Sequence, residues 1–301
     1  MSTTTTLLRG EAEAANPGTR RMFWYFGYGS NMDLNSLRAK GVAPRSSQPA
    51  LVSHWRLRFN VRHFFSHEGG VGNIEPAPGA NVWGVLHLCD DQHLAALDDA
   101  EAYGYGYDRA LLRVRTAVGE QDALTYVGMP AFLDDRCLPT RRYLNILLQG
   151  ARAAGLDAAY VAALARQPLH APPLRPPYRA PAGEHPAFDA GTLARHPLHT
   201  ALADAVFDMS AAQPRHFFLR QLFGGKDMTL FHLQRMDRST GRETLDDIGA
   251  GRLDDAQRSC LNEYLHEYAL EYRYAGRYLR ARPAPCLQPA VQPLDGPHDS
   301  G

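Results

Sequence analysis

The chain has 301 residues, with 32 Lys plus Arg balanced by 32 Asp plus Glu, so its formal net charge is +0. This length suits one large domain or two modest ones, and the balanced charge gives no overall field to attract nucleic acid or an anionic membrane. No apolar run approaches the ~20 residues that span a bilayer, and the first 21 residues lack the apolar core of a secretory signal, so we expect a soluble, cytoplasmic protein.

Three changes in composition divide the chain. Residues 1–21 are predicted to be a disordered leader, and residues 281–301 a disordered tail rich in Pro and Gly. Residues 168–186 are dense in proline, which favours an extended linker. Two ordered blocks remain, 22–167 and 187–280. Since few contacts are expected to cross such a linker, the first block is predicted to fold alone.

The cysteines are scattered along the chain and form no CxxC pair: they are Cys89, Cys137, Cys260 and Cys286. This pattern suits reduced thiols, and it predicts neither disulfides nor a zinc site.

The first block is predicted to be rich in strands. An aromatic strand at Met22–Phe26 opens it, and further strands are expected at Trp55–Val61, Asn81–Leu88, Leu111–Ala117 and Ala123–Gly128. Helical spacing of Leu94 and Leu97 predicts a helix between the third and fourth strands. A second helix is expected after Thr140, with Gly155 to end it, and Asp157 caps a third. The block is therefore predicted to be α+β, with a barrel-like sheet and flanking helices.

The second block is smaller. A helical start over Ala190–Leu202, a strand at Ala205–Met209 and a turn at Gly224-Gly225 precede a long helix. That helix carries an apolar stripe, typical of core packing, at Leu261, Tyr264, Leu265 and Tyr268. The stretch Arg273–Arg277 is expected to form the helix end.

Residues 25–31 read YFGYGSN, at the end of the first strand. One interpretation is a plain turn, because Gly27 and Gly29 permit backbone angles that other residues avoid. The other is a loop of successive backbone N–H groups that holds a carboxylate or a developing oxyanion. The segment alone does not separate these interpretations.

The rest of the first block favours the second interpretation. YFGYGSN resembles the signature loop of the γ-glutamylcyclotransferase family, and PGANVWGVLHL resembles the family's later strand. AALDDAEAYGYGY matches the family's acidic helix end, and PTRRY matches its Pro-Ser-x-x-Tyr motif with Thr140 in place of Ser. These motifs keep the family's order over residues 22–167.

The resemblance implies an enzyme (acyltransferase or lyase) that cyclises a small-molecule γ-glutamyl compound to 5-oxoproline and releases an amine or amino acid. The α-amine attacks the γ-carbonyl of its own molecule, so no cofactor is needed. The family match assigns Glu101 as general acid/base, whereas Asp98 and Asp99 are expected on a solvated helix face. The implied substrate-binding residues are Tyr25, Phe26, Gly27, Tyr28, Gly29, Ser30, Asn31, Tyr107 and Tyr143.

Residues 188–280 resemble a cytochrome b5-like haem/steroid-binding domain, through VFDMS, the turn at Gly224–Asp227 and the end of the long helix. His216 lies near the first axial position, but the second position holds Asp237, and the tyrosine ligand of one branch is replaced by Arg220 or lost. The sequence therefore predicts no stoichiometric haem. Haem, an apolar ligand and a protein partner remain alternatives, with Tyr264 or Tyr268 as substitute haem ligands.

Two other functions stay open. The same fold could act on a γ-glutamylamine or a γ-glutamylated biosynthetic intermediate. A non-catalytic protein that binds a small molecule or haem is the alternative of a different class. The leaving amine has no readable motif.

Overall fold

The computed structural model describes residues 21–280, so the leader and tail predicted from the sequence lie outside the described residues, apart from Arg21. The first block is α+β and contains a closed barrel with strand order β1-β3-β2-β4-β5. Its strands are β1 (Met22–Gly27), β2 (Ser46–Arg62), β3 (Gly70–Asp90), β4 (Tyr107–Thr116) and β5 (Gly119–Gly128). Four of the five expected strands lie within these, and the fifth, Leu111–Ala117, extends one residue beyond the end of β4; β2 and β3 are much longer than predicted.

The first strand closes the barrel. β1 runs antiparallel to β3, with Tyr25 opposite His87, and parallel to β5, with Tyr25 opposite Leu124. The barrel is filled by side chains that the strands turn inward, including Phe26, Ile74 and Leu86, each at most 1% exposed. Because β1 is held on both sides, the loop that follows it leaves the barrel from a rigid base.

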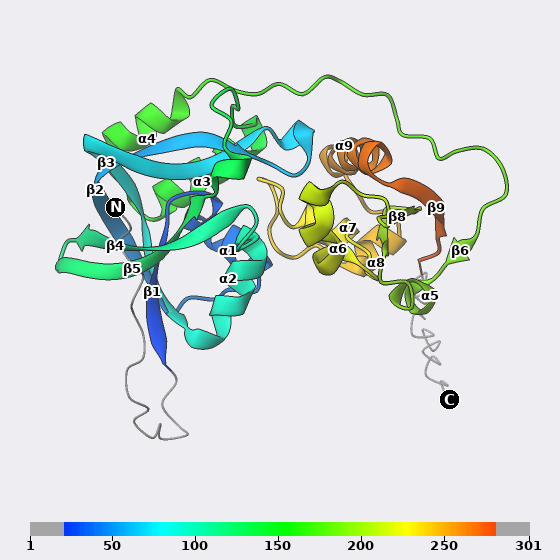
Figure 1. Ribbon diagram of the computed structural model, residues 1–301, viewed down its shortest axis with the longest axis horizontal. Helices are drawn as coiled ribbons and strands as arrows, with labels where there is room; N and C mark the ends of the chain where they lie inside the picture. Colours follow the sequence, from blue (N-terminus) through cyan, green and yellow to red (C-terminus); the bar gives the residue numbers. More distant parts are fainter. Residues whose placement is uncertain (1–20, 281–301) are drawn as a thin grey trace, which may run out of the picture.

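Helices pack around the barrel (Figure 1). They are α1 (Leu34–Ala39), α2 (Leu94–Glu101), α3 (Arg141–Ala153) and α4 (Ala158–Ala165), with short 3-10 turns η1 (Ser30–Met32), η2 (Ser66–Glu68), η3 (Asp91–His93) and η4 (Pro130–Phe132). Thr140 and Asp157 cap α3 and α4 with their side chains, as predicted. Gly155 adopts φ +70° after α3, which confirms its role in ending that helix. The helix α1 had no clear sequence signal.

The second block contains a four-stranded sheet with order β6-β9-β8-β7, covered by helices. Its elements are β6 (Ala187–Phe188), α5 (Ala190–Ala194), β7 (His199–Leu202), β8 (Ala205–Asp208), η5 (Pro214–His216), α6 (Phe217–Phe223), α7 (Thr229–Leu233), α8 (Leu245–Gly249), α9 (Asp255–Glu271) and β9 (Arg273–Tyr278). Two predictions were wrong. The expected helix over Ala190–Leu202 ends at Ala194 and gives way to β7, and the expected helix end at Arg273–Arg277 is β9, which pairs with β8.

The two blocks share a core, contrary to the expected independence of the first. Phe65, in the loop between β2 and β3, is 2% exposed and belongs to the apolar cluster of the second block. Its ring stacks on Tyr268, with centroids 5.3 Å apart, and meets Tyr264 edge-on at 5.6 Å. A barrel without the second block would expose this ring to water, at a cost in stability.

The proline-rich segment also packs against the second block. It leaves α4 and runs across to β6 (Figure 1). The Tyr178 backbone N–H donates to Asn262 Oδ1 at 2.6 Å, and Asn262 Nδ2 donates back to the Pro176 carbonyl at 3.1 Å. These bonds fix the segment along α9. Within residues 21–280, no helix is both long and apolar enough to cross a membrane.

Candidate active site

The loop after β1 is organised by the side chain of Asn31, which is 3% exposed. Asn31 Nδ2 donates to the Tyr25 hydroxyl at 2.5 Å and to Glu101 Oε1 at 2.8 Å. Asn31 Oδ1 accepts from Lys40 Nζ, which also donates to Ser30 Oγ at 3.0 Å. One amide therefore connects the strand, the carboxylate and a buried cation, so the loop keeps a single conformation.

His87, on β3, holds the backbone of this loop. Its Nε2 lies 2.9 Å from the Asn31 carbonyl and its Nδ1 lies 2.8 Å from Ser47 Oγ. A carbonyl only accepts, so Nε2 carries the proton and Nδ1 accepts from Ser47. Burial lowers the pKa of His87 to about 4, against a smaller opposing effect of the Asn31 bond. The imidazole is therefore neutral at physiological pH and acts as a positioning group.

Glu101 is the last residue of α2. The helix ends because Ala102 adopts a left-handed conformation, with φ 49°. The Glu101 side chain is 16% exposed, and its Oε1 lies 3.7 Å from Lys40 Nζ. The carboxylate is thus bound by an amide from the loop after β1 and lies near a cation that follows α1. Part of it remains accessible to solvent.

Lys40 was missed by the sequence reasoning, because a single lysine after a short helix carries no motif. Its side chain is 4% exposed. Burial lowers the pKa of Lys40 to about 8, although the nearby Glu101 carboxylate raises it. A lysine with a lowered pKa beside a carboxylate is typical of functional sites.

Three tyrosines lie beside Glu101, and their hydroxyl groups form different hydrogen bonds. Tyr28 donates its hydroxyl proton to the Tyr126 carbonyl, and Tyr107 donates to the Gly72 carbonyl, both at 2.6 Å. Tyr143 instead accepts from the Gly72 N–H at 2.9 Å. The proton of Tyr143 therefore remains available to a ligand, whereas that of Tyr107 is already used.

Burial keeps these hydroxyls neutral. It raises the pKa of Tyr143 to about 12, against the lowering effect of the Gly72 bond, and the Glu101 charge raises it further. Burial also raises the pKa of Tyr28 and Tyr107 well above the ordinary value. All three act as neutral hydrogen-bonding groups.

Seven of the nine expected binding residues, together with Glu101, surround one recess of about 30 Å³. Its lining is Tyr25, Tyr28, Gly29, Ser30, Asn31, Gly72, Glu101, Tyr107, Tyr126 and Tyr143. Phe26 and Gly27 do not line it, because Phe26 points into the barrel core and is 0% exposed. Phe26 follows the recess-lining Tyr25 and so faces the other side of the strand, whereas Gly27 has no side chain and packs against the backbone of Asn31.

The loop glycines are explained by close approach. Neither Gly27 nor Gly29 has a positive φ, although Gly29, with φ -107° and ψ -141°, lies outside the ordinary helical and extended regions. A Cβ on Gly29 would lie 2.9 Å from the Tyr143 hydroxyl, and one on Gly27 would lie 3.1 Å from the Asn31 carbonyl oxygen. The backbone N–H groups of Tyr28 and Gly29 donate to no acceptor within residues 21–280. They are therefore free to bind an anion at the recess.

The two aspartates before Glu101 have other roles. Asp98 accepts from Arg109 Nε at 2.9 Å and from the Tyr126 hydroxyl at 2.7 Å, so it is a structural ion-pair residue and not the freely solvated one expected. Asp99 is exposed, as predicted, at the rim of a larger space.

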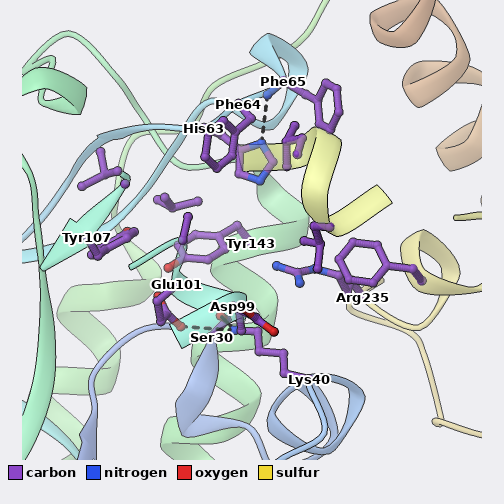
Figure 2. Close-up of a pocket in the computed structure, with 18 of the residues that line it drawn as sticks. Ser30, Lys40, His63, Phe64, Phe65, Asp99, Glu101, Tyr107, Tyr143 and Arg235 are labelled. Carbon is purple, nitrogen blue, oxygen red and sulfur yellow. Dashed lines mark hydrogen bonds and ion pairs between the residues drawn. The ribbon is translucent and has the colours of Figure 1, made fainter. Parts of the chain in front are cut away.

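That larger space is a cavity of about 310 Å³ between the two blocks. Ser30, Glu101, Tyr107 and Tyr143 line both it and the recess. Figure 2 shows Glu101, Tyr143 and Lys40 on one side and Arg235, from the second block, on another. The sequence did not predict that the second block contributes to this cavity, because residues more than 100 positions apart meet there.

The candidate haem ligands in the second block are engaged in other hydrogen bonds. His216 is 0% exposed, and both ring nitrogens are engaged: Nδ1 with the Tyr272 hydroxyl at 2.9 Å and Nε2 with the Phe64 carbonyl at 3.0 Å. Asp237 accepts from Asn145 Nδ2 at 2.7 Å, across the contact between the blocks. The substitute ligands are engaged too, because Tyr264 donates to Glu68 and Tyr268 bonds His232. Among residues 21–280, no cluster of His, Cys, Asp or Glu is arranged to hold a metal ion.

Known proteins are similar in sequence to part of this chain. A model of the AIG2-like family matches residues 81–164. The γ-glutamyl cyclotransferase aclK of Aspergillus oryzae is 27% identical over 181 residues, which cover 52% of this chain and 66% of the relative. Human γ-glutamylcyclotransferase is 26% identical over 141 residues, which cover 46% of this chain and 74% of the relative.

A solved structure of a γ-glutamyl cyclotransferase has 24% sequence identity and a TM-score of 0.44, over 50% of this chain and 90% of its own. The chain spans just under two thirds of the length of the fungal relative. Over about half of its length, the chain is similar to the γ-glutamylcyclotransferase family, as its motifs predict.

Proposed function

We propose that this chain is a cyclotransferase that converts a γ-glutamyl compound into 5-oxoproline and a free amine. The observation that carries the proposal is the Glu101 carboxylate. It is held by Asn31 and Lys40 at the junction of a small polar recess and a larger cavity. The relatives named γ-glutamylcyclotransferase support the same activity.

In the proposed reaction, Glu101 acts as base and then as acid. It accepts a proton from the substrate's α-ammonium group, and the freed amine attacks the γ-carbonyl carbon. A new C–N bond closes the five-membered ring, and the old C–N bond to the leaving amine breaks. Glu101 returns the proton to the leaving nitrogen, and the second proton of the ring nitrogen is taken up by the released amine, which leaves as an ammonium, so the carboxylate is regenerated. Nucleophile and electrophile belong to one molecule, so positioning supplies much of the rate enhancement and no cofactor enters the balance.

The loop and Tyr143 have binding roles in this proposal. The free N–H groups of Tyr28 and Gly29 hold the substrate's α-carboxylate or the oxyanion formed at the γ-carbon. Tyr143, whose hydroxyl accepts the Gly72 N–H, donates a hydrogen bond to the same unit. Tyr107 shapes the recess and does not donate to the substrate, because its proton is bound to Gly72.

The direct test is to incubate the purified full chain with γ-glutamyl amino acids and γ-glutamylamines and to measure 5-oxoproline by chromatography. Formation of 5-oxoproline with an equal amount of free amine supports the proposal. Binding of the compounds without any 5-oxoproline would instead favour a non-catalytic binding protein.

A further inference from the structure

Arg235 places a guanidinium in the large cavity. It follows α7 in the second block, and Figure 2 shows its guanidinium pointing into the space that Tyr143 and Glu101 border. Within residues 21–280, its side chain forms no hydrogen bond and no ion pair. Its guanidinium carbon lies over the ring of Phe231, 4.8 Å from the ring centroid.

The other positive residues around the cavity are accounted for. Arg142 is paired with the buried carboxylate of Glu68, and Lys40 is bonded to Ser30 and Asn31. Arg62 is exposed to solvent. His63 and His232 are neutral, because burial lowers the pKa of His63 to about 4 and that of His232 well below its ordinary value. Arg235 therefore supplies the unbalanced positive charge deep in the cavity.

Keeping Arg235 there without a partner is costly. Burial lowers the pKa of its guanidinium and the charge of Arg142 lowers it further, against the raising effect of Tyr264, Glu68 and Glu101. A guanidinium stays charged in proteins, so it cannot avoid this cost by losing its proton. A ligand anion would remove the cost, which makes the position a candidate binding site.

The backbone at Arg235 is fastened to the barrel block. Arg142 Nη1, on α3, donates to the Arg235 carbonyl at 2.5 Å. On the next two turns of α3, Asn145 Nδ2 donates to Asp237 Oδ2 at 2.7 Å and Gln149 Nε2 donates to the Asp237 carbonyl at 3.0 Å. Because Tyr143 lies on the same helix, Arg235 is held at a constant position relative to the recess.

Apolar groups make up somewhat more than half of the lining of the cavity between Arg235 and the recess. Its apolar lining includes Phe64 and Phe132 from the barrel block and Phe218, Leu219, Leu222, Phe223 and Phe231 from the second block. A volume of about 310 Å³ lies at the lower end of small-molecule sites. The part of a γ-glutamyl substrate that extends beyond the recess enters this space.

We propose that Arg235 binds a carboxylate on the leaving amine, and that the body of this amine is apolar. This inference rests on the proposed cyclotransferase function. A carboxylate fits better than a phosphate, because one free guanidinium offers one positive charge and a flat, two-pronged donor set. The second block thus selects γ-glutamyl derivatives of apolar amino acids over γ-glutamylamines.

The test compares γ-glutamyl-L-phenylalanine with its C-terminal amide, which has the same body without the charge, and with γ-glutamylglycine, which lacks the apolar body. Wild-type protein is expected to prefer the acid over the amide by about 10- to 100-fold in kcat/KM. Arg235→Met is expected to abolish that preference while it leaves turnover of the amide within a few-fold, which also shows that the variant is folded. Arg235→Lys is expected to retain part of the preference, since it keeps the charge without the fork.

Arg238→Met is the matched control, because Arg238 is exposed three residues further on, and it should keep the wild-type preference. Equal kcat/KM for acid and amide in the wild type would overturn the inference and leave the proposed function standing, as would a preference that survives in Arg235→Met. Turnover of γ-glutamylglycine as fast as the phenylalanine compound would overturn the apolar part.

Absence of 5-oxoproline from every compound would refute the proposed function. Calorimetric binding of the acid and the amide would then still decide the role of Arg235. A loss of the acid's tighter binding in Arg235→Met supports it, and equal or undetectable binding of both compounds refutes it.

Discussion

Replacement of Glu101 by glutamine tests the proposed chemistry most directly. In the wild type, Asn31 Nδ2 donates to Glu101 Oε1 at 2.8 Å. The glutamine Oε1 can still accept this bond, so the recess keeps its shape. An amide cannot take the ammonium proton of the substrate. Loss of general-base assistance typically costs at least about 100-fold in rate, which corresponds to about 2.7 kcal/mol in the activation barrier.

The same change removes a charge 3.7 Å from Lys40 Nζ. At an effective dielectric constant of ~20, that separation gives an attraction of about 4 kcal/mol before relaxation. We therefore expect Glu101→Gln to be less stable at pH 7, and a second change, Lys40→Met, to restore stability without restoring activity. Comparison of the single and double variants separates the effect of the lost charge on stability from the effect of the lost base on activity.

The assay is 5-oxoproline release under single-turnover conditions, with substrate binding measured by calorimetry. Asp99→Asn is the matched control, because it makes the same carboxylate-to-amide change on the same helix at an exposed residue, and we expect its rate to stay within twofold of the wild type. A Glu101→Gln variant that turns over at nearly the wild-type rate would show that Glu101 is not the base.

Three further predictions follow from the site and from the shared core. Gly29→Val should raise KM by at least tenfold, because even its Cβ would lie 2.9 Å from the Tyr143 hydroxyl; an unchanged KM would return the loop to the role of a plain turn. Lys40 has a folded pKa of about 8 against an ordinary 10.5, so the folded state binds fewer protons between those values and gains stability as pH rises through that window. The unfolding free energy of the wild type relative to Lys40→Met should therefore increase by about 3 kcal/mol between pH 7.5 and 10.5 in urea titrations, and a flat difference would contradict the assigned burial. Phe65→Ala should lower the free energy of unfolding by about 3–5 kcal/mol, whereas Leu111→Ala, at a residue 72% exposed, should change it by less than about 0.5 kcal/mol. Equal effects of the two changes would argue against the shared core.

The barrel block was the more predictable part of the fold. Runs of β-branched and aromatic residues indicated the five strands, and the caps Thr140 and Asp157 marked two helices. The extra length of β2 and β3 was not readable, because their added segments contain Pro49, Pro76 and several glycines. These segments become strands because each pairs with the other along the barrel, with a register shift beside His54, whose φ is 66°.

The second block shows the limit of local patterns. Residues 199–202 lie in a stretch that resembles a helix, yet they form β7 opposite β8. Residues 273–278 follow a 17-residue helix without a proline or glycine stop, yet they form β9 between β6 and β8. Strand pairing depends on partners distant in sequence, so local propensity did not predict it.

The sequence by itself indicated which residues line the recess. The YFGYGSN loop, Glu101 after its acidic helix and Tyr143 after Thr140 are local motifs, and the structure brings these residues to one space. Tertiary structure alone decided what surrounds them. Lys40 acquires its pKa of about 8 through burial, and Arg235 reaches the cavity because Phe65 and α3 bind the second block to the barrel. Burial and the meeting of distant segments are properties of the packed chain, so no short stretch of sequence encodes them.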